Sequence, residues 1–327
     1  MADYISLGRA LVADPRFIAK YQDTNREQLR PCLACTAGCL GGVKAGKGLQ
    51  CTVNPDVGNE MEPIIEAGES KKVAVIGGGL AGMESALTLK KRGHEVTIFE
   101  KDEFGGQFNY AFLPTGKKTM ARILDYYKTG IENENIDIIY EEPSEEKLIS
   151  SFEEVVVATG SEPAVPPISG LENVDYYWAE IMQKDKIPEN KNVFIIGGGL
   201  IGVDIATALV DNDNNVTIVK RTTDFGEDME TITKKLSLNK LKMNNVTFSD
   251  HTNITRIEEG AVYAERKGEE IKFENIDIYV VSTGMKSYYP FSENLEENIP
   301  VHIVGDAHVP GNVQNAIKSG REVALKI

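Results

Sequence analysis

A glycine-rich turn between two apolar runs constrains the fold of this chain more than any other feature. The stretch from Lys72 to Glu100 begins with a β-branched run, continues with a helical pattern and ends with a second β-branched run. The turn has the spacing G-x-G-x-x-G, and an acid follows its last glycine after 18 residues: Gly77, Gly79, Gly82 and Glu100. This order of strand, turn, helix and strand is typical of a dinucleotide site.

Each residue of this pattern has its own expected task. Gly77 permits the turn, Gly79 leaves room for a pyrophosphate, and Gly82 lets the helix and the strand pack closely. Free N–H groups at the start of the helix would point at the phosphates, and Glu100 would accept hydrogen bonds from ribose hydroxyls. A glycine-rich turn with only a structural role is the alternative interpretation.

The same pattern returns 120 residues further along the chain. The stretch Asn192–Lys220 repeats the strand, the turn and the helix, with the glycine spacing carried by Gly197, Gly199 and Gly202. The alternation of strands and helices continues to Gly284. We therefore predict an α/β protein with two Rossmann-like dinucleotide-binding domains, the second inserted into the first.

The two repeats differ at one position that bears on the nucleotide. The first repeat ends on Glu100, whereas the second has Lys220 followed by Arg221. An acid holds free ribose hydroxyls, and a basic pair attracts a 2′-phosphate. The second site therefore favours NADP(H). NAD(H), a solvated surface pair, and a relic site that binds only an adenosine nucleotide are the alternatives.

All four cysteines lie within 20 residues of one another, with the spacing C-x2-C-x3-C-x11-C: Cys32, Cys35, Cys39 and Cys51. Four thiolates suit either tetrahedral zinc or an iron–sulfur cluster. The single C-x-x-C knuckle and the glycines around it favour the cluster, because backbone N–H groups can then approach its sulfurs. Zinc and buried free thiols remain open.

Other residues are candidates for contacts with a flavin. Gly106 and Gln107 follow the first repeat, where a flavin enzyme of this architecture brings its chain along the cofactor. Thr159 and Gly160 end a buried strand against the nucleotide, and Asp306 ends another where it could bind the ribityl or ribose chain. An ordinary strand end and a capped turn are the structural alternatives for these positions.

Composition excludes several classes of function. The net charge of −15 argues against sequence-independent binding to nucleic acid or to an anionic membrane. No apolar run approaches the ~18 residues of a membrane span, and the first residues lack the basic region of a signal peptide. We expect a cytoplasmic protein, where thiols stay reduced. No Ser-His-Asp or Cys-His pattern is present, so no catalytic side chain is nominated.

Taken together, these motifs resemble a known family. The segments GRALVADP, PCLACTAGC, CTVNP, VAVIGGGLAGMESA, FGGQFNYA, VVVATG and IVGDA resemble the C-terminal half of iron–sulfur flavoenzymes of the bacterial 2,4-dienoyl-CoA reductase and trimethylamine dehydrogenase type. Such enzymes begin with an FMN-carrying (β/α)8 barrel. Residues 1–20 look like the end of that barrel, with Gly8 and Arg9 beside the FMN phosphate, and the rest of the barrel is absent from this chain. Within them, Tyr4–Leu7 is expected to form a short strand, and a helix is expected to begin with Asp14 as its cap and Pro15 at its first position.

The resemblance implies an electron relay. NAD(P)H on the second site would pass a hydride to FAD on the first, and FAD would pass single electrons to a 4Fe-4S cluster on the four cysteines. In the family the cluster feeds FMN in the barrel, which reduces an activated C=C bond such as that of an enoyl- or dienoyl-CoA. The implied partner is a flavin barrel, in the same full-length protein or as a separate subunit, and the complete enzyme is expected to be an oligomer.

The expected division of the chain follows from the same comparison. The ranges are 1–30 for the barrel remnant, 31–70 for the iron–sulfur segment and linker, 71–162 with 286–327 for the FAD-binding domain, and 163–285 for the NAD(P)-binding domain. Two other functions remain open. One is an electron-transfer subunit like the small subunit of glutamate synthase, and the other is a non-catalytic scaffold that binds ADP and FAD.

Overall fold

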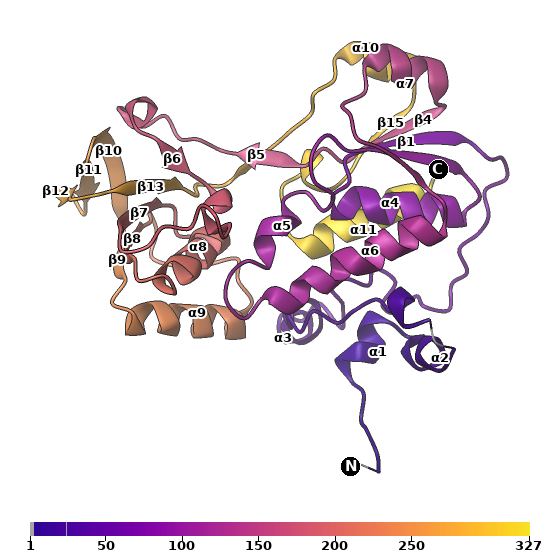
Figure 1. Ribbon diagram of the computed structural model, residues 1–327, viewed down its shortest axis with the longest axis horizontal. Coiled ribbons are helices and arrows are strands. Elements are labelled where there is room, and N and C mark those ends of the chain that lie inside the picture. Colours follow the sequence, from indigo (N-terminus) through magenta and orange to yellow (C-terminus); the bar gives the residue numbers. More distant parts are fainter. Residues whose placement is uncertain (1–2, 24) are drawn as a thin grey trace. The chain divides into compact units, whose positions relative to one another are not determined.

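The computed structural model describes residues 3–23 and 25–327, which form two compact units (Figure 1). The first unit contains the residues up to Asn109 together with Thr119–Ser161 and Ser287–Ile327. The second unit contains Tyr110–Lys118 and Glu162–Lys286. The chain therefore enters the second unit twice, first for a short segment and then for the whole second repeat.

The first unit is built on a five-stranded parallel sheet with the strand order β15-β4-β1-β2-β3. The strands of β-branched residues named above form its centre and are buried on both faces, as is usual in a parallel sheet. Its strands are β1 (Lys72–Ile76), β2 (Glu95–Phe99), β3 (Asp137–Ile139), β4 (Glu154–Val157) and β15 (Val301–Ile303).

Helices cover both faces of this sheet. On one face α4 packs against α6 and α11 (Figure 1). On the other face Leu148 and Leu295, from α7 and α10, pack with Ala74 and Ile76 of β1. The helices are α4 (Leu80–Lys91), η3 (Lys118–Ala121), α6 (Arg122–Asn133), α7 (Glu145–Ser151), α10 (Glu293–Asn298), η6 (Gly305–Ala307) and α11 (Val313–Ala324), and α5 (Phe108–Ala111) stands at the boundary between the units.

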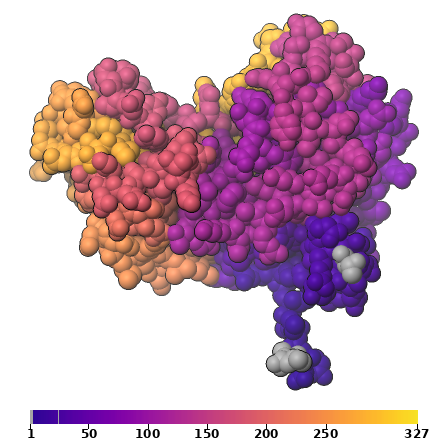
Figure 2. Space-filling model, in the orientation of Figure 1, coloured from indigo at the N-terminus to yellow at the C-terminus, as the bar shows by residue number. Residues whose placement is uncertain are grey.

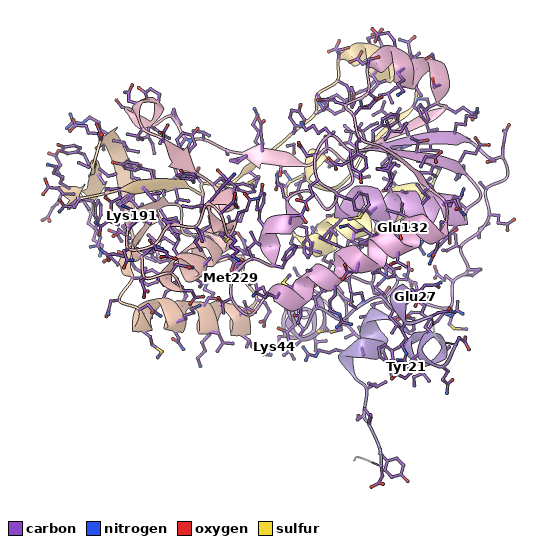
Figure 3. All side chains as sticks on the ribbon, in the orientation of Figure 1. Tyr21, Glu27, Lys44, Glu132, Lys191 and Met229 are labelled. Atoms are coloured by element: carbon purple, nitrogen blue, oxygen red, sulfur yellow. The ribbon has the colours of Figure 1, made fainter. Side chains whose placement is uncertain are left out.

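Short helices and loops precede the first strand, and two expectations for them are wrong. Tyr4 and its neighbours form no strand; Tyr4 is 94% exposed, and this segment extends from the body of the first unit in Figure 2. The helix expected to begin at Pro15 begins at Phe17, although the Asp14 carboxylate accepts the backbone N–H of Arg16, as the side chain of a residue before a helix does. The elements are α1 (Arg9–Ala13), α2 (Phe17–Gln22), η1 (Arg26–Gln28), η2 (Ala37–Gly41) and α3 (Gly42–Lys44); Tyr21, Glu27 and Lys44 are labelled in Figure 3.

The second unit repeats the parallel sheet with the order β6-β13-β7-β8-β9. Alternate residues of β7 point to opposite faces. Val193 and Ile195 belong to the core beneath α8, and Phe194 and Ile196 pack under an antiparallel sheet. The parallel strands are β6 (Tyr176–Tyr177), β7 (Asn192–Ile196), β8 (Asn215–Val219), β9 (Thr247–Ser249) and β13 (Ile278–Val281). The antiparallel sheet contains β10 (Thr252–Glu258), β11 (Ala261–Arg266) and β12 (Glu269–Glu274), and the helices are η4 (Leu171–Asn173), η5 (Ala179–Met182), α8 (Leu200–Val210) and α9 (Thr231–Met243).

The short segment Tyr110–Lys118 is an integral part of the second unit. The Tyr110 ring meets the ring of Trp178 edge-on at a centroid distance of 5.6 Å. The Lys117 ammonium lies 2.5 Å from a carboxylate oxygen of Asp204 on α8. No motif in the sequence indicates this placement, and the segment ends 44 residues before the long insertion begins at Glu162.

The expected α/β class with two Rossmann-like units is confirmed. Two short strands, β5 (Ser161–Pro163) and β14 (Met285–Ser287), pair where the chain passes from one repeat to the other and back. Within the described ranges no helix is both long enough and apolar enough to cross a membrane.

Candidate functional site

The first glycine turn has the tight geometry that its sequence predicts. Gly77 has a φ of +110°, and a Cβ there would lie 2.3 Å from the carbonyl oxygen of Ala158. A Cβ on Gly82 would lie 2.0 Å from the carbonyl oxygen of Gly77. Gly79, the N-cap of α4, has open space where its Cβ would be. Two glycines are therefore required by the fold, and the third leaves an open approach to the N-terminus of the helix.

Glu100 holds this turn from the end of β2. Its side chain is buried, and its carboxylate accepts the Gly78 N–H at 2.7 Å and the Asp102 N–H at 2.9 Å. Each carboxylate oxygen keeps further lone pairs. The Glu100 carboxylate thus fixes the turn by binding backbone N–H groups of Gly78 and Asp102. The contact with ribose expected from the sequence stays a prediction.

The segment after β2 returns to the glycine turn. The Gly105 N–H donates to the Gly78 carbonyl at 2.9 Å, and a Cβ on Gly106 would lie only 3.6 Å from the Cα of Gly79. The neighbouring Gln107 amide donates to the Ser161 carbonyl. Gly106 therefore lies beside Gly79, and Gln107 is bound to the start of β5.

Asp306 joins these residues through Ser161. The Ser161 hydroxyl donates to one carboxylate oxygen of Asp306 at 3.2 Å, and the Gly311 N–H donates to the other at 3.0 Å. Burial raises the pKa of Asp306, against the opposing effect of these two hydrogen bonds. Thr159 is tied to the carbonyl of Tyr288 at 2.5 Å. Ser161 was not predicted from the sequence, although it directly follows Thr159 and Gly160.

The second glycine turn reproduces the first. Gly197 has a φ of +111°, and its Cβ would lie 2.0 Å from the Ser282 carbonyl oxygen. A Cβ on Gly202 would lie 2.1 Å from the Gly197 carbonyl oxygen, and Gly199 again faces open space. The second unit therefore offers the same kind of approach to the N-terminus of α8.

The basic pair of the second turn is partly neutralised by its neighbours. Lys220 donates to the Asp224 carbonyl at 2.8 Å and forms an ion pair with Glu227 at 2.8 Å. Its side chain is only 11% exposed, whereas Arg221 is exposed. Lys220 lies beside the turn, since a Cβ on Gly198 would be 3.3 Å from the Cβ of Lys220.

Each turn is covered by a phenylalanine that was not predicted from the sequence. A Cβ on Gly78 would lie 2.9 Å from the ring of Phe104, and one on Gly198 would lie 2.4 Å from the ring of Phe225. Both rings are buried. The signal was available, because a Phe-Gly pair follows each repeat at an offset of 121 residues. Met229, labelled in Figure 3, belongs to the same loop as Phe225 and is buried with it.

Two buried carboxylates also repeat. Glu84 and Asp204 each stand two residues after the third glycine of their motif. Burial by itself would raise the pKa of Glu84, but the Arg30 guanidinium beside it holds that pKa below its ordinary value. Burial raises the pKa of Asp204 even though Lys117 opposes the shift. Neither carboxylate was predicted from the sequence, although the offset of the repeats marks them as equivalent.

The four cysteines line one cavity in the first unit. Arg9 and Val12 of α1 contribute to its wall beside Cys32, Cys35, Cys39 and Cys51. All four thiols are free. Within residues 3–23 and 25–327, no three side chains of His, Cys, Asp or Glu are gathered closely enough to hold one metal ion.

The backbone around these thiols has unusual geometry. Ala34 and Thr36, on either side of Cys35, have φ values of +55° and +56°, a left-handed conformation that non-glycine residues rarely adopt. Thr52 lies 3.2 Å from the Cys35 sulfur. Burial raises the pKa of the Cys51 thiol, and the backbone N–H groups of Val53 and Asn54 oppose that shift by hydrogen bonding to it. The donor set of four thiols with amide hydrogen bonds fits a thiolate-bound group.

Comparison with known proteins agrees with this geometry. The profile of the family described as "Pyridine nucleotide-disulphide oxidoreductase" matches residues 52–113 and 71–315. An NADH oxidase of Thermoanaerobacter brockii is 32% identical over 100% of the chain, which covers 52% of that relative. A cinnamate reductase of Clostridium sporogenes is 32% identical over 99% of the chain, which covers 50% of it.

A solved structure gives the same result. The complex of 2-naphthoyl-CoA reductase with 2-naphthoyl-CoA matches with a TM-score of 0.90 and 28% identity, over 98% of this chain and 50% of that one. The chain thus spans about half the length of the relatives it matches, and the resemblance to 2,4-dienoyl-CoA reductase-like enzymes is confirmed. The chain is an oxidoreductase module that depends on flavin and pyridine nucleotide, and it belongs to the pyridine nucleotide-disulphide oxidoreductase family.

Proposed function

We propose that this chain is the electron-input module of a larger reductase, and that it oxidises NAD(P)H. The observation that carries the proposal is the repeated turn, which opens onto a helix N-terminus at Gly79 and again at Gly199. One turn is held by the acid Glu100, and the other lies beside the base Lys220. Two nucleotide sites with opposite charge suit one flavin and one nicotinamide cofactor.

The residues of the first unit would hold FAD. The N-terminus of α4 would receive the pyrophosphate, Glu100 the ribose, and Asp306 with its neighbours the ribityl chain. When bound, the flavin supplies the exchange between hydride transfer from a nicotinamide and single-electron transfer. The chain's own part is to bind and orient, since no acid or base is needed for the hydride step. We assign residues 71–162 and 286–327 to FAD.

The residues of the second unit, 163–285, would hold the nicotinamide nucleotide. We propose NADP(H) as the preferred form. Lys220 and Arg221 take the place of the acid in the first repeat, and a basic pair attracts the 2′-phosphate that an acid would repel. The Lys220–Glu227 ion pair weakens this preference, since Glu227 already takes part of the positive charge. NAD(H) therefore remains a usable substrate in this proposal.

The cysteine cavity in residues 31–70 would hold a 4Fe-4S cluster, which carries single electrons. All four cysteines line one cavity, and the backbone N–H groups of Val53 and Asn54 hydrogen-bond to the Cys51 thiol. These amide hydrogen bonds to sulfur, together with the single C-x-x-C pair, support the cluster over one zinc ion.

The final acceptor would lie outside this chain. We propose an FMN barrel, in the same protein or as a separate subunit, that reduces an activated C=C bond, and we place the complete oligomer in the cytoplasm. Relatives named as a cinnamate reductase and a 2-naphthoyl-CoA reductase support this class of substrate. Their covered share, about half, leaves room for a further domain.

Anaerobic reconstitution tests this proposal. The chain would be purified, supplied with FAD, iron and sulfide, and recorded by visible absorbance before and after addition of NADPH. We expect flavin bands, a broad iron–sulfur band, and reduction of a dye by NADPH. Cys39→Ser should remove the iron–sulfur band and keep the flavin. A colourless protein with one bound zinc would overturn the proposal, and a flavoprotein that neither nicotinamide reduces would support the scaffold function.

A further inference from the structure

Arg30 connects the two ends of the cysteine segment. It stands two residues before Cys32, and its guanidinium donates to the carbonyl of Val53, two residues after Cys51. Its backbone N–H donates to the buried Asp14 carboxylate at 2.9 Å. Because the cavity of the thiols lies between these ends, Arg30 closes the loop that contains all four of them.

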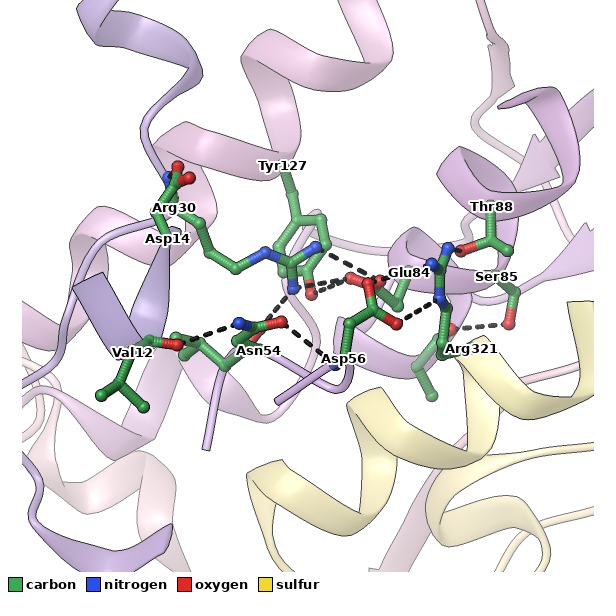
Figure 4. Close-up of polar contacts among 12 residues, drawn as sticks. Val12, Asp14, Arg30, Asn54, Asp56, Glu84, Ser85, Thr88, Tyr127 and Arg321 are labelled. Atoms are coloured by element: carbon green, nitrogen blue, oxygen red, sulfur yellow. Dashed lines mark hydrogen bonds and ion pairs between the residues drawn. The ribbon is translucent and has the colours of Figure 1, made fainter. Parts of the chain in front are cut away.

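The same guanidinium attaches this loop to the nucleotide-binding helix. Its Nη1 lies 3.0 Å from Oε2 of Glu84 on α4, and its Nη2 lies 3.3 Å from Oε1 (Figure 4). The phenol of Tyr127 on α6 donates to the same Oε2 at 2.8 Å. The side chains of Arg30 and Glu84 are 12% and 3% exposed, so water competes little for these bonds. A two-pronged contact of this kind fixes orientation as well as distance.

A second attachment lies just beyond Cys51. Arg321 of α11 binds both carboxylate oxygens of Asp56, at 3.0 and 2.9 Å, and also the hydroxyl of Thr88 on α4 at 3.1 Å (Figure 4). Asn54 adds a hydrogen bond to the Val12 carbonyl at 2.9 Å. The cysteine segment is thus joined to α4 and α11, the helix that follows Asp306.

The second unit has an ion pair at the position equivalent to Glu84. Asp204, the equivalent of Glu84, is bound by Lys117 of the separate segment Tyr110–Lys118. In both units, a buried acid on the nucleotide-binding helix receives a cation from a segment outside the repeat. The pair in the second unit is simpler, since Oδ1 of Asp204 has no hydrogen-bond partner among the described residues. It therefore provides a matched control.

We propose that Arg30 is a positioning residue that holds the four-cysteine cavity at one fixed place on the flavin unit by joining both ends of the segment to Glu84. This role of Arg30 rests on the proposed function, because electron transfer between FAD and an iron–sulfur cluster requires a fixed arrangement of the two groups. A lysine at position 30 would keep the charge but not the planar fork that binds Val53 and Glu84 together.

Hydrogen exchange on the full chain without cofactors tests the attachment itself. Arg30→Met should lower the protection of residues 30–56 by at least about tenfold, and Glu84→Gln should do the same from the helix side. Arg30→Lys should give an intermediate loss. The matched variant Lys117→Met should leave residues 30–56 protected. Unchanged protection in Arg30→Met, or equal loss in Lys117→Met, would overturn the proposal.

The reconstituted protein provides a readout that general destabilisation does not give. Arg30→Met should change the visible circular dichroism of the iron–sulfur group and speed iron release to a chelator by about tenfold, with flavin content unchanged and partial recovery in Arg30→Lys. If Arg30→Met does not fold, Glu84→Gln and Arg30→Lys decide by the same measurements. Wild-type protein without iron would contradict the proposed function, whereas iron-loaded Arg30→Met with the wild-type spectrum would contradict the role of Arg30.

Discussion

Lys220 and Glu227 form an ion pair of 2.8 Å beside the second glycine turn. The sequence favours Lys220 and Arg221 as a basic pair for a 2′-phosphate, but in the structure Lys220 has an acidic partner seven residues further along the chain. Glu227 is half exposed, at 49%, while Lys220 is largely covered. The pair is therefore weak enough to open for a phosphate, and Glu227 competes with that phosphate for the same ammonium group.

Substitutions at both ends of this pair should move the nucleotide preference in opposite directions. Lys220→Glu should lower kcat/KM for NADPH relative to NADH by about tenfold or more, because it places a like charge against the 2′-phosphate. Glu227→Gln should raise the same ratio by up to about fivefold, the value of an exposed ion pair. Dye reduction with each nicotinamide measures both ratios. Lys235→Glu, on α9, makes the same charge change as Lys220→Glu and should leave the ratio unaltered; equal ratios in all four proteins would refute the basic pair as the determinant.

Gly79 and Gly82 should respond very differently to the same added methyl group. Gly79→Ala should keep the melting temperature of the cofactor-free protein, since its Cβ meets open space, and it should weaken FAD binding by at least about tenfold by obstructing the approach of the pyrophosphate. Gly82→Ala should lower stability by about 1–3 kcal/mol or more, because its Cβ would overlap the Gly77 carbonyl. Thermal unfolding and bound-flavin absorbance check these outcomes, and full FAD retention in Gly79→Ala would disprove the assignment.

The sequence predicts the nucleotide turns well because their constraints are local. The β-branched runs that lead into Gly77 and Gly197 specify buried strands, and the glycine spacing itself specifies the close contacts. The expected strand near Tyr4 fails for a complementary reason. A strand needs a hydrogen-bonded neighbour, and the described part of the chain provides none for this exposed segment.

Contacts between distant segments were beyond the reach of sequence patterns. Nothing local to Arg30 shows that it meets Glu84, 54 residues away, and nothing local to Lys117 shows that it meets Asp204. Asp14 illustrates the same limit, because its carboxylate binds the nearby N–H of Arg16 and also the N–H of Arg30, and only the first contact is local. Only the repeat itself held usable information, since it marks Glu84 and Asp204 as equivalent.

Removing Lys117 should make the stability of the second unit depend on pH. Burial raises the pKa of Asp204, so its protonated form favours the folded state and stability falls as pH rises through the folded pKa. In Lys117→Met the ionised carboxylate is left without a partner, which should cost about 3–5 kcal/mol at neutral pH and less towards pH 4. Asp204→Asn should remove this dependence. Trp178 is the single tryptophan and packs against the same core. Its fluorescence during urea unfolding gives the free energy of unfolding of the wild type, Lys117→Met and Asp204→Asn at each pH. A pH-independent loss in Lys117→Met would show that Asp204 is not the titrating group.

The two phenylalanines that cover the turns allow the division of labour between the units to be tested. Each ring packs against its own turn, Phe104 on Gly78 and Phe225 on Gly198. Replacement by leucine keeps most of the buried volume, so each variant should fold with a loss below about 1.5 kcal/mol. Phe104→Leu should weaken FAD retention without changing KM for NADPH at saturating FAD. Phe225→Leu should raise KM for NADPH and leave flavin content intact, so each variant is the control for the other. A ring that supports only one turn can disturb only the nucleotide bound at that turn. Loss of flavin in Phe225→Leu and not in Phe104→Leu would therefore mean that FAD occupies the second turn.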